Sequence, residues 1–276
     1  MRKLTIFLLL TFISSYAISQ SLYPLIHLNQ EREYKTKKPK KIVETNIFYN
    51  SNGIKTDKSI KTFDESGMLL TEERYNESGE LTARLIYTND TINKLKLSRS
   101  FESWNTFGYS KETAYYAYDK NNFLVSITDK NANDQIIYIS KILCNTKGDP
   151  IELLLFDGNG NSYGKEIATY YYDKNLVTTS VISNVGKTLS NSTRKINYEK
   201  AYLFPSNSEV YNDKGDLIIV RGINSNGDAI EKISEEEYVY DGYGNCTENK
   251  SYKVTVKKNG KEIRKIERIF KKQYTY

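Results

Sequence analysis

Histidine is almost absent from this sequence, and its scarcity narrows the chemistry that the protein can carry out. His27 is the one histidine among 276 residues. Multi-histidine metal sites and H-E-x-x-H zinc helices need at least two, and a nucleophilic triad needs its histidine beside its partners. We therefore expect no catalytic residues, no metal ligands and no cofactor, and we interpret His27 as a surface residue.

Long apolar runs are confined to the N-terminus. Arg2 and Lys3 precede an apolar run of about ten residues, Leu4 to Ile13, which is too short to cross a bilayer and is typical of a secretory signal peptide. Small residues around Ser19 predict cleavage that leaves a mature protein starting near Gln20, with cleavage after Ala17 as the second choice and an uncleaved anchor as the alternative. The predicted location is secreted, periplasmic or cell-surface, with no membrane span after cleavage.

Cysteine is also scarce, and Cys144 and Cys246 are too far apart in the sequence for a C-x-x-C motif. A disulfide is chemically allowed after export. The strand spacing derived below would place the two residues tens of ångströms apart in an open sheet, whereas a disulfide needs Cα atoms within about 7 Å. We predict that the thiols are not linked to each other.

Residues 20–41 show no turn or alternating pattern and are interpreted as a basic leader or linker. Five lysines gather in the second half of this segment: Lys35, Lys37, Lys38, Lys40 and Lys41. They suit either a contact with an anionic surface or, as we favour, a solvated linker. The chain is thus divided into a signal peptide (1–19), a leader (20–41) and a repeat domain (42–276), and the leader is expected to be dispensable for folding.

Glycine residues mark a sequence repeat. Eleven of the fifteen glycines stand at the fourth position of a turn signal that opens on a polar residue, as in Asn-Asp-Lys-Gly at 212–215. An Asn or Asp side chain can bond its own backbone at the first position, and glycine supplies the left-handed conformation at the fourth. These glycines are Gly53, Gly67, Gly79, Gly108, Gly148, Gly160, Gly186, Gly215, Gly227, Gly244 and Gly260.

Weaker turns fill the gaps in this series, at Ile92, Asn122, Ala132, Leu176 and Lys200. The turns then recur about every 14 residues, which leaves room for one strand each and none for a crossover helix. Successive strands must be antiparallel neighbours. The predicted fold is all-β: a long twisted antiparallel meander of repeated hairpins, curled into a spiral or open half-barrel. Only the charged run Glu231 to Glu237 suggests the start of a helix.

Tyrosine is abundant, with 24 copies against one tryptophan. The residue four before each turn mark is usually aromatic. Assigning alternate turns to opposite edges predicts an aromatic ladder along one edge, buried on the concave side and holding the fold: Tyr49, Tyr75, Trp104, Phe156, Tyr211 and Tyr240.

The unit aromatic-(Asp/Asn)-x-x-Gly-x-(Leu/Ile) resembles the YD repeat of rearrangement-hotspot proteins. It occurs as FDESGML from Phe63, YNESGEL from Tyr75 and YNDKGDL from Tyr211. The resemblance implies secreted or surface β-structure with carbohydrate or cell-envelope association, and sometimes a shell around a toxin. The spacing here is shorter than in that family, and an Asp-Pro-x-Gly stretch near the C-terminus is missing. A short free-standing form fits better than a toxin carrier.

The predicted function is a non-catalytic β-repeat scaffold or binding protein with a glycan or envelope protein as its partner, and with no nucleic acid. The candidate binding residues are Tyr170, Tyr171, Tyr172 and Tyr240. The first alternative is an envelope partner or immunity-type protein, for which the basic C-terminal segment would contact an acidic partner. That segment also suits an edge strand that lysines protect from aggregation.

The second alternative is a glycoside hydrolase that uses two carboxylates. Asp157, Asp241 and the Glu235–Glu237 run are its candidates. Each has a simpler explanation, because the two aspartates open turns and the glutamates form a solvated stretch. No enzyme activity is expected.

Overall fold

The computed structural model describes residues 21–28, 37–196 and 208–276. The predicted signal peptide and its cleavage site, Lys35 and the turn at Lys200 lie outside these residues. The described chain contains one short helix, α1 (Leu22–Ile26), one 3-10 turn, η1 (Tyr172–Lys174), and seventeen strands. The strands are β1 (Lys41–Asn50), β2 (Gly53–Phe63), β3 (Leu69–Tyr75), β4 (Leu81–Asp90), β5 (Leu95–Asn105), β6 (Gly108–Tyr118), β7 (Leu124–Asn131), β8 (Ile136–Cys144), β9 (Pro150–Asp157), β10 (Ser162–Tyr171), β11 (Leu176–Ser183), β12 (Thr188–Lys195), β13 (Glu209–Tyr211), β14 (Leu217–Ile223), β15 (Ala229–Tyr240), β16 (Cys246–Val256) and β17 (Glu262–Thr275).

The glycine turns form as the sequence predicts. All eleven glycines have positive φ, for example +80° at Gly215. In that turn the Asn212 carbonyl accepts from the Gly215 N–H at 3.0 Å. The Asn212 side-chain oxygen accepts from the N–H groups of Lys214 and Asp216 at 3.0 and 2.9 Å. The asparagine thus satisfies backbone donors that the tight turn leaves without strand partners, which is why the motif opens on Asn or Asp.

Asn122 also adopts positive φ as predicted, at +64°. Three other turn positions were wrong by one or two residues. The left-handed residues are Lys94, Asp134 and Asn175 rather than Ile92, Ala132 and Leu176. Asp and Asn tolerate this conformation better than residues with larger or apolar side chains, so local backbone energetics moved two of the three turns onto polar residues.

One antiparallel sheet contains all the strands, and its order differs from the order of the chain. Pairing runs from β1 through β12 in sequence order, and from β13 through β17. The last strand, β17, then pairs with the first, β1, from Lys41–Thr275 to Phe48–Arg268. No register joins β12 to β13 among the described residues. The sheet therefore opens between β12 and β13, in the middle of the sequence.

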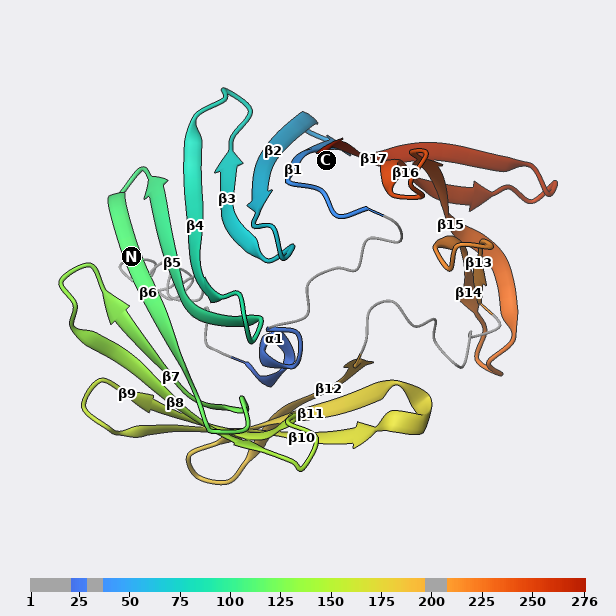
Figure 1. Cartoon of the computed structure of the whole chain (residues 1–276). Coiled ribbons are helices and arrows are strands. Elements are labelled where there is room, and N and C mark those ends of the chain that lie inside the picture. Colours follow the sequence, from blue (N-terminus) through green and yellow to red (C-terminus); the bar gives the residue numbers. More distant parts are fainter. Residues whose placement is uncertain (1–20, 29–36, 197–207) are drawn as a thin grey trace, which may run out of the picture.

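The predicted fold class is confirmed: a meander of antiparallel hairpins forms one open, curled sheet (Figure 1). The expectation that the basic C-terminal segment forms an edge strand is wrong, because β17 has a partner on each side. The run Glu231–Glu237 lies within β15 and is not helical.

A buried ion cluster lies where the first and last strands meet. Glu44 of β1 is 7% exposed and lies 2.7 Å from the Lys61 ammonium on β2 and 3.5 Å from that of Lys272 on β17. Ser59 donates a further hydrogen bond to Glu44 at 3.1 Å. Burial opposes ionisation, but the two lysines hold the pKa of Glu44 below its ordinary value. The cluster thus ties together three strands from both ends of the chain.

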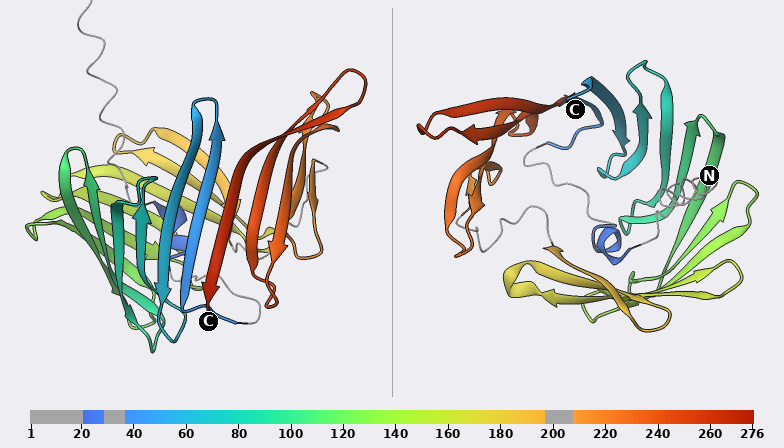
Figure 2. Two further views of the ribbon diagram at one scale, coloured as in Figure 1. Left: turned by 90° about the horizontal axis from the view of Figure 1, so that it is seen from above. Right: turned by 180° about the vertical axis from the view of Figure 1, so that it is seen from behind.

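The hydrophobic core lies on the concave face of β6 to β11, under α1 (Figures 1 and 2). Leu22, Leu25 and Ile26 of the helix are buried against that face. The sheet contributes Ala114, Tyr116, Leu124, Ile127, Ile142, Leu153, Ala168 and Val177. A curled sheet cannot fill its own centre with side chains from one face alone, so the helix supplies the missing apolar surface.

Buried charges hold both ends of this segment. A Glu166 carboxylate oxygen accepts from the Leu22 N–H at 2.8 Å and from the Ser21 hydroxyl at 3.0 Å. The Lys96 ammonium donates to the Leu28 carbonyl at 2.5 Å. The first N–H groups and the last C=O groups of a helix have no partner within the helix. A carboxylate at the start can accept from the former, and an ammonium at the end can donate to the latter. Residues 21–28 are therefore packed and not a linker, and His27, 9% exposed, is not a surface residue.

Candidate functional site

Three Tyr-x-Tyr pairs stand along one edge of the sheet: Tyr170 with Tyr172, Tyr238 with Tyr240, and Tyr274 with Tyr276. In each pair the rings are stacked, with centroids 5.4, 6.2 and 5.9 Å apart. The first tyrosine of each pair donates its hydroxyl to the carbonyl of the residue that follows an earlier turn on the same edge: Pro150, Leu217 and Cys246, at 2.9, 3.1 and 2.9 Å. Each pair therefore connects the end of one strand to the turn of the neighbouring hairpin in the sheet.

The second tyrosine of each pair bonds the two polar residues that open and close that earlier turn. The Tyr172 hydroxyl donates to Asp149 at 2.7 Å and accepts from Asn145 at 2.6 Å. The Tyr240 hydroxyl donates to Asp216 and accepts from Asn212 at 2.8 Å. A phenol has one hydrogen to donate and lone pairs to accept with, so one carboxylate and one amide satisfy it.

In the third pair, the carboxylate and the amide exchange places. The turn at 241–245 opens on Asp241 and closes on Asn245, and Tyr276 donates to the first and accepts from the second at 2.8 Å. Burial and the hydrogen bond to Asp241 raise the pKa of Tyr276. The network needs one acid and one amide per turn, whichever comes first.

Cations cover the outward faces of these rings. The ammonium of Lys147 lies 3.5 Å from the Tyr172 ring centroid, and that of Lys214 lies 3.7 Å from the Tyr240 centroid. Each lysine is the third residue of the turn that the ring contacts. Lys37 occupies the corresponding place over Tyr276, at 5.3 Å. These contacts leave little of either ring face for a ligand.

The four predicted binding residues have different surroundings in the structure. Tyr170, Tyr172 and Tyr240 belong to the turn network just described, and the break between β12 and β13 separates Tyr240 from the other two along the sheet. Tyr171 points to the convex face, is 43% exposed, and has only the Lys174 ammonium near its ring, at 5.9 Å. The four residues do not form one site.

The predicted ladder does not form a continuous row either. All six members are half-buried, and none belongs to the core cluster. Directly paired residues share a face, so the registers place Tyr49, Tyr75, Trp104 and Phe156 on the convex face, and Tyr211 and Tyr240 on the concave one. The predicted burial on the concave side was wrong for the first four. Pairing of β17 with β1 also puts the turn after Tyr240 on the opposite edge from the turn after Tyr49.

The carboxylates proposed for acid–base chemistry have structural partners. Asp157 accepts from the N–H groups of Asn159 and Asn161, and Asp241 bonds its own turn and Tyr276. The glutamates Glu235, Glu236 and Glu237 bond Lys232, Asn249 and Arg264 respectively. Within the described ranges, no group of three or more His, Cys, Asp and Glu side chains is placed to hold a metal ion.

Asp129 is a buried acid that sequence reasoning missed. It is 8% exposed, on the concave face of β7, and it shares a register row with Ala114 of β6 and Arg99 of β5. Burial raises the pKa of Asp129 to about 6, although Arg99 acts in the opposite direction and Glu112 adds to the rise. Asp129 lies within β7, two residues after the core residue Ile127, but an acidic side chain in a strand gave no signal of burial in the sequence.

The two cysteines are not linked to each other. Cys144 ends β8, and its thiol lies 3.4 Å from the Leu124 carbonyl. Leu124 follows a turn, as do Pro150 and Leu217, whose carbonyls accept from Tyr170 and Tyr238. Burial raises the pKa of the Cys144 thiol to about 11, and Asp119 and Asp149 contribute. Cys246 begins β16, in the other part of the sheet.

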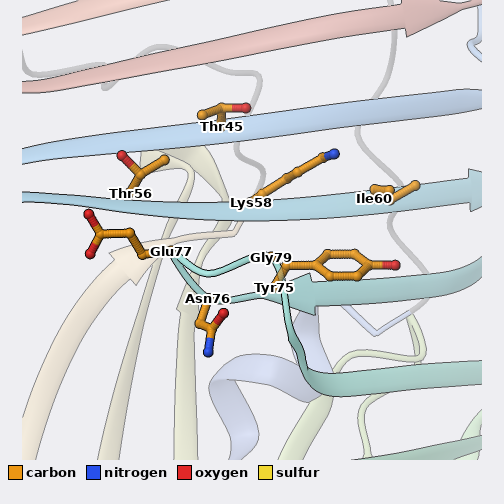
Figure 3. Close-up of a pocket in the computed structure, with 8 residues that line it drawn as sticks. All are labelled: Thr45, Thr56, Lys58, Ile60, Tyr75, Asn76, Glu77 and Gly79. Atoms are coloured by element: carbon orange, nitrogen blue, oxygen red, sulfur yellow. The ribbon is translucent and has the colours of Figure 1, made fainter.

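A hollow of about 360 Å³ lies on the convex face over β1, β2 and the turn after β3 (Figure 3). Its lining is Thr45, Thr56, Lys58, Ile60, Tyr75, Asn76, Glu77 and Gly79. Lys58 and Tyr75 extend in the same direction from neighbouring strands, with the ammonium 6.0 Å from the ring centroid. The Tyr75 hydroxyl donates to Glu73 at 2.7 Å, which fixes the ring at the rim of the hollow. One aromatic face thus meets hydroxyl, amide, ammonium and carboxylate groups.

Comparison with known proteins finds similarity to solved structures alone. No family model matches the chain. No curated protein matches it either. A porin-like protein from Bacteroides uniformis is 14% identical, with 88% of this chain and 100% of that chain covered and a TM-score of 0.44. A TcdB2-TccC3 structure without its hypervariable C-terminal region is 12% identical, with 79% and 16% covered and a TM-score of 0.20.

A putative outer membrane lipoprotein-sorting protein domain from Vibrio parahaemolyticus is 8% identical, with 63% of this chain and 94% of that chain covered and a TM-score of 0.18. With TM-scores below 0.5, these likenesses carry no argument about this chain. In the part of the chain that the structure describes, no helix is long and apolar enough to cross a membrane.

Proposed function

We propose that this chain is a non-catalytic β-repeat scaffold, exported to the periplasm or cell surface, that binds carbohydrate at the hollow beside Tyr75. The observation that supports it is the composition of that hollow: one fixed aromatic ring with polar groups of both hydrogen-bonding types around it. A sugar ring presents an apolar face of C–H groups and a rim of hydroxyls, so it suits one aromatic face among donors and acceptors.

Tyr75 belongs to the repeat unit YNESGEL, but its contacts differ from those of the tyrosines in the turn network. Tyr172 and Tyr240 have their hydroxyls bonded to turns and their rings covered at 3.5 and 3.7 Å by lysines. At Tyr75 the Lys58 ammonium lies 6.0 Å from the ring centroid, and Lys58 comes from the neighbouring strand β2. The distance leaves room for a ligand between the groups that line the hollow.

Membership of the YD-repeat type is part of the proposal. The turn geometry supports it, since the repeated unit is a hairpin whose Asp or Asn, Gly and aromatic residues each have a defined role. The apolar N-terminal run supports export. Absence of catalysis is also part of the proposal, and its support is that Asp157, Asp241 and the Glu235–Glu237 run are bonded to turns and neighbouring strands.

The test is a glycan-array screen of the mature protein, followed by calorimetric titration of each glycan retained. Tyr75→Ala should reduce affinity at least tenfold, and Tyr75→Phe should retain most of it, because stacking needs the ring and not the hydroxyl. The matched control is Tyr115→Ala. Tyr115 is 45% exposed on the same convex face, with the Lys130 ammonium 5.5 Å from its ring, but it lies outside the hollow.

Equal loss of binding in Tyr75→Ala and Tyr115→Ala would remove the hollow as the site. Binding of no glycan by a folded protein would overturn the proposed ligand class. Thermal midpoints of all variants, measured in parallel, separate loss of binding from loss of fold.

A further inference from the structure

The hairpin of β16 and β17 continues past its last registered pairs with the strands on either side of it. The last pair between β16 and β15 is Lys253 with Ser234, and the last between β17 and β1 is Arg268 with Phe48. Pairing within the hairpin continues to Val256 and Glu262. Figure 2 shows this hairpin reaching past the neighbouring β1–β2 hairpin. Its end, residues 253–265, is called the basic tip below.

The basic tip carries a surplus of positive charge. It contains six basic residues, Lys253, Lys257, Lys258, Lys261, Arg264 and Lys265, and one acid, Glu262, so its net charge is +6 − 1 = +5. Arg264 is paired with Glu237 and Glu235, and Glu262 with Lys232. The other five basic residues are exposed, and within the described chain none of them has a salt bridge.

Exposed isoleucines lie at the same end of the sheet. Ile263, within the tip, is 42% exposed. The adjacent hairpin of β14 and β15 turns back at the same edge, and beside its turn Ile223 and Ile230 are 55% and 47% exposed. Exposed isoleucines do not stabilise a charged surface that only water contacts. Lysines that surround exposed isoleucines are typical of surfaces that attach to a lipid interface.

We propose that the basic tip docks on a bilayer surface that carries anionic phospholipid headgroups. The five unpaired lysines contact the phosphates, and the isoleucines enter the interfacial layer. Each lysine near such a surface strengthens attachment, and salt weakens it. None of residues 253–265 lines the hollow beside Tyr75, so either proposal can fail without the other.

The experiment is co-sedimentation of the mature protein with vesicles of phosphatidylcholine alone, or of phosphatidylcholine with about a third phosphatidylglycerol. We expect binding to the mixed vesicles that falls as sodium chloride rises, and little binding to phosphatidylcholine alone. The triple variant K257Q/K258Q/K261Q should bind on the order of 100-fold more weakly. Ile263→Ser should weaken binding without changing its dependence on salt.

The matched control replaces three exposed lysines from other turns by glutamine: Lys120, Lys174 and Lys187. It removes the same charge from the molecule and should bind as the unmodified protein does. Equal weakening by the two triple variants would show a general charge effect and overturn the proposal. So would binding that does not distinguish the two vesicle types, or retention on an acidic polysaccharide with none on the mixed vesicles. Thermal midpoints show that each variant is folded.

Discussion

Tyrosine hydroxyls do much of the work of joining hairpins in this protein. In a meander, each turn is held by its own two strands, and nothing in the strand ladder connects one turn to the next on the same edge. The hydroxyls of Tyr172, Tyr240 and Tyr276 make that connection by bonding both ends of an earlier turn. Of the aromatic residues four before a glycine turn, Tyr240 has this role, whereas the hydroxyls of Tyr75 and Tyr211 donate to Glu73 and Glu209.

Tyr240→Phe tests this role at one residue. The change keeps the ring and the stacking on Tyr238 but leaves Asp216 and Asn212 without their shared partner. We expect the free energy of unfolding to fall by about 1 kcal/mol, measured by urea titration. Tyr171→Phe is the control and should change it by less than about 0.5 kcal/mol, because Tyr171 is exposed and outside the network. Equal effects of the two variants would contradict the network.

Asp129 predicts a pH dependence. The pKa of Asp129 in the folded protein is about 6, above the ordinary value of 3.8. The contribution of protonated Asp129 to the free energy of unfolding is therefore fully present below pH 3.8 and is lost as the pH rises through 6. Asp129→Asn removes this loss. We expect the variant to be more stable than the unmodified protein at pH 7 by up to about 3 kcal/mol, with the difference vanishing near pH 4.

The measurement is urea unfolding at pH 4, 5, 6 and 7. Asp213→Asn, at an exposed turn residue, is the control and should give parallel curves. A difference between Asp129→Asn and the unmodified protein that is constant across this range would show that ionisation of Asp129 is not its cause.

At the scale of elements, α1 lies outside the β-hairpin repeat and completes the hydrophobic core. Seventeen strands have one face toward the inside of the curl, and the largest apolar part of that face is covered by five helical residues. Glu166 and Lys96 fix the ends of the segment through buried contacts. A segment so anchored contributes to folding and is not a passive leader.

Leu22→Ala should therefore destabilise the protein by about 2–5 kcal/mol, since Leu22 is 0% exposed in the core. Pro24→Ala, on the exposed side of the same helix, should have a much smaller effect. Deleting residues 20–41 should lower the thermal midpoint by well over a few degrees, the reverse of the expectation from sequence. A midpoint unchanged by the deletion would mean that the helix packs without stabilising the sheet.

At the scale of the whole molecule, the ends of the chain and the ends of the sheet are in different places. The first and last strands pair through eight registered positions and share the Glu44 cluster, while the free edges belong to β12 and β13. A meander needs only hairpin contacts between neighbours, so the closing pair of β1 and β17 is the one long-range strand pairing in the described sheet.

A circular permutant tests this arrangement. Joining Tyr276 to Ser21 through a flexible linker of about 15 Gly and Ser residues, with new ends placed between Ile196 and Ser208, breaks no strand pairing in the described sheet. We expect a thermal midpoint within a few degrees of the unmodified protein. A permutant opened at the turn of Gly108 separates β5 from β6 and should be clearly less stable. Equal losses in both permutants would contradict the pairing of β17 with β1.

The sequence by itself determined the features that depend on local backbone preferences, namely the turns and the strands between them. Asn or Asp at the first turn position and Gly at the fourth have strong backbone preferences, so turns such as 212–216 were predictable, and with them the strands, the antiparallel pairing and the curled open sheet. Where the preference was weak, as at Ala132, the prediction was wrong by two residues: the turn opens on Asn131, and the residue with positive φ is Asp134.

Only the tertiary structure decided which ends of the meander meet. Pairing of β1 with β17 depends on the accumulated twist and curl of the whole sheet, which no local motif encodes, and it reassigned turns such as that of Gly244 to the other edge. The concave and convex faces followed from the same closure, and they determined that Tyr75 lies beside an open hollow while Tyr240 is held in a turn network. Three apolar residues of α1, Leu22, Leu25 and Ile26, then became part of the core because they cover the apolar part of the concave face.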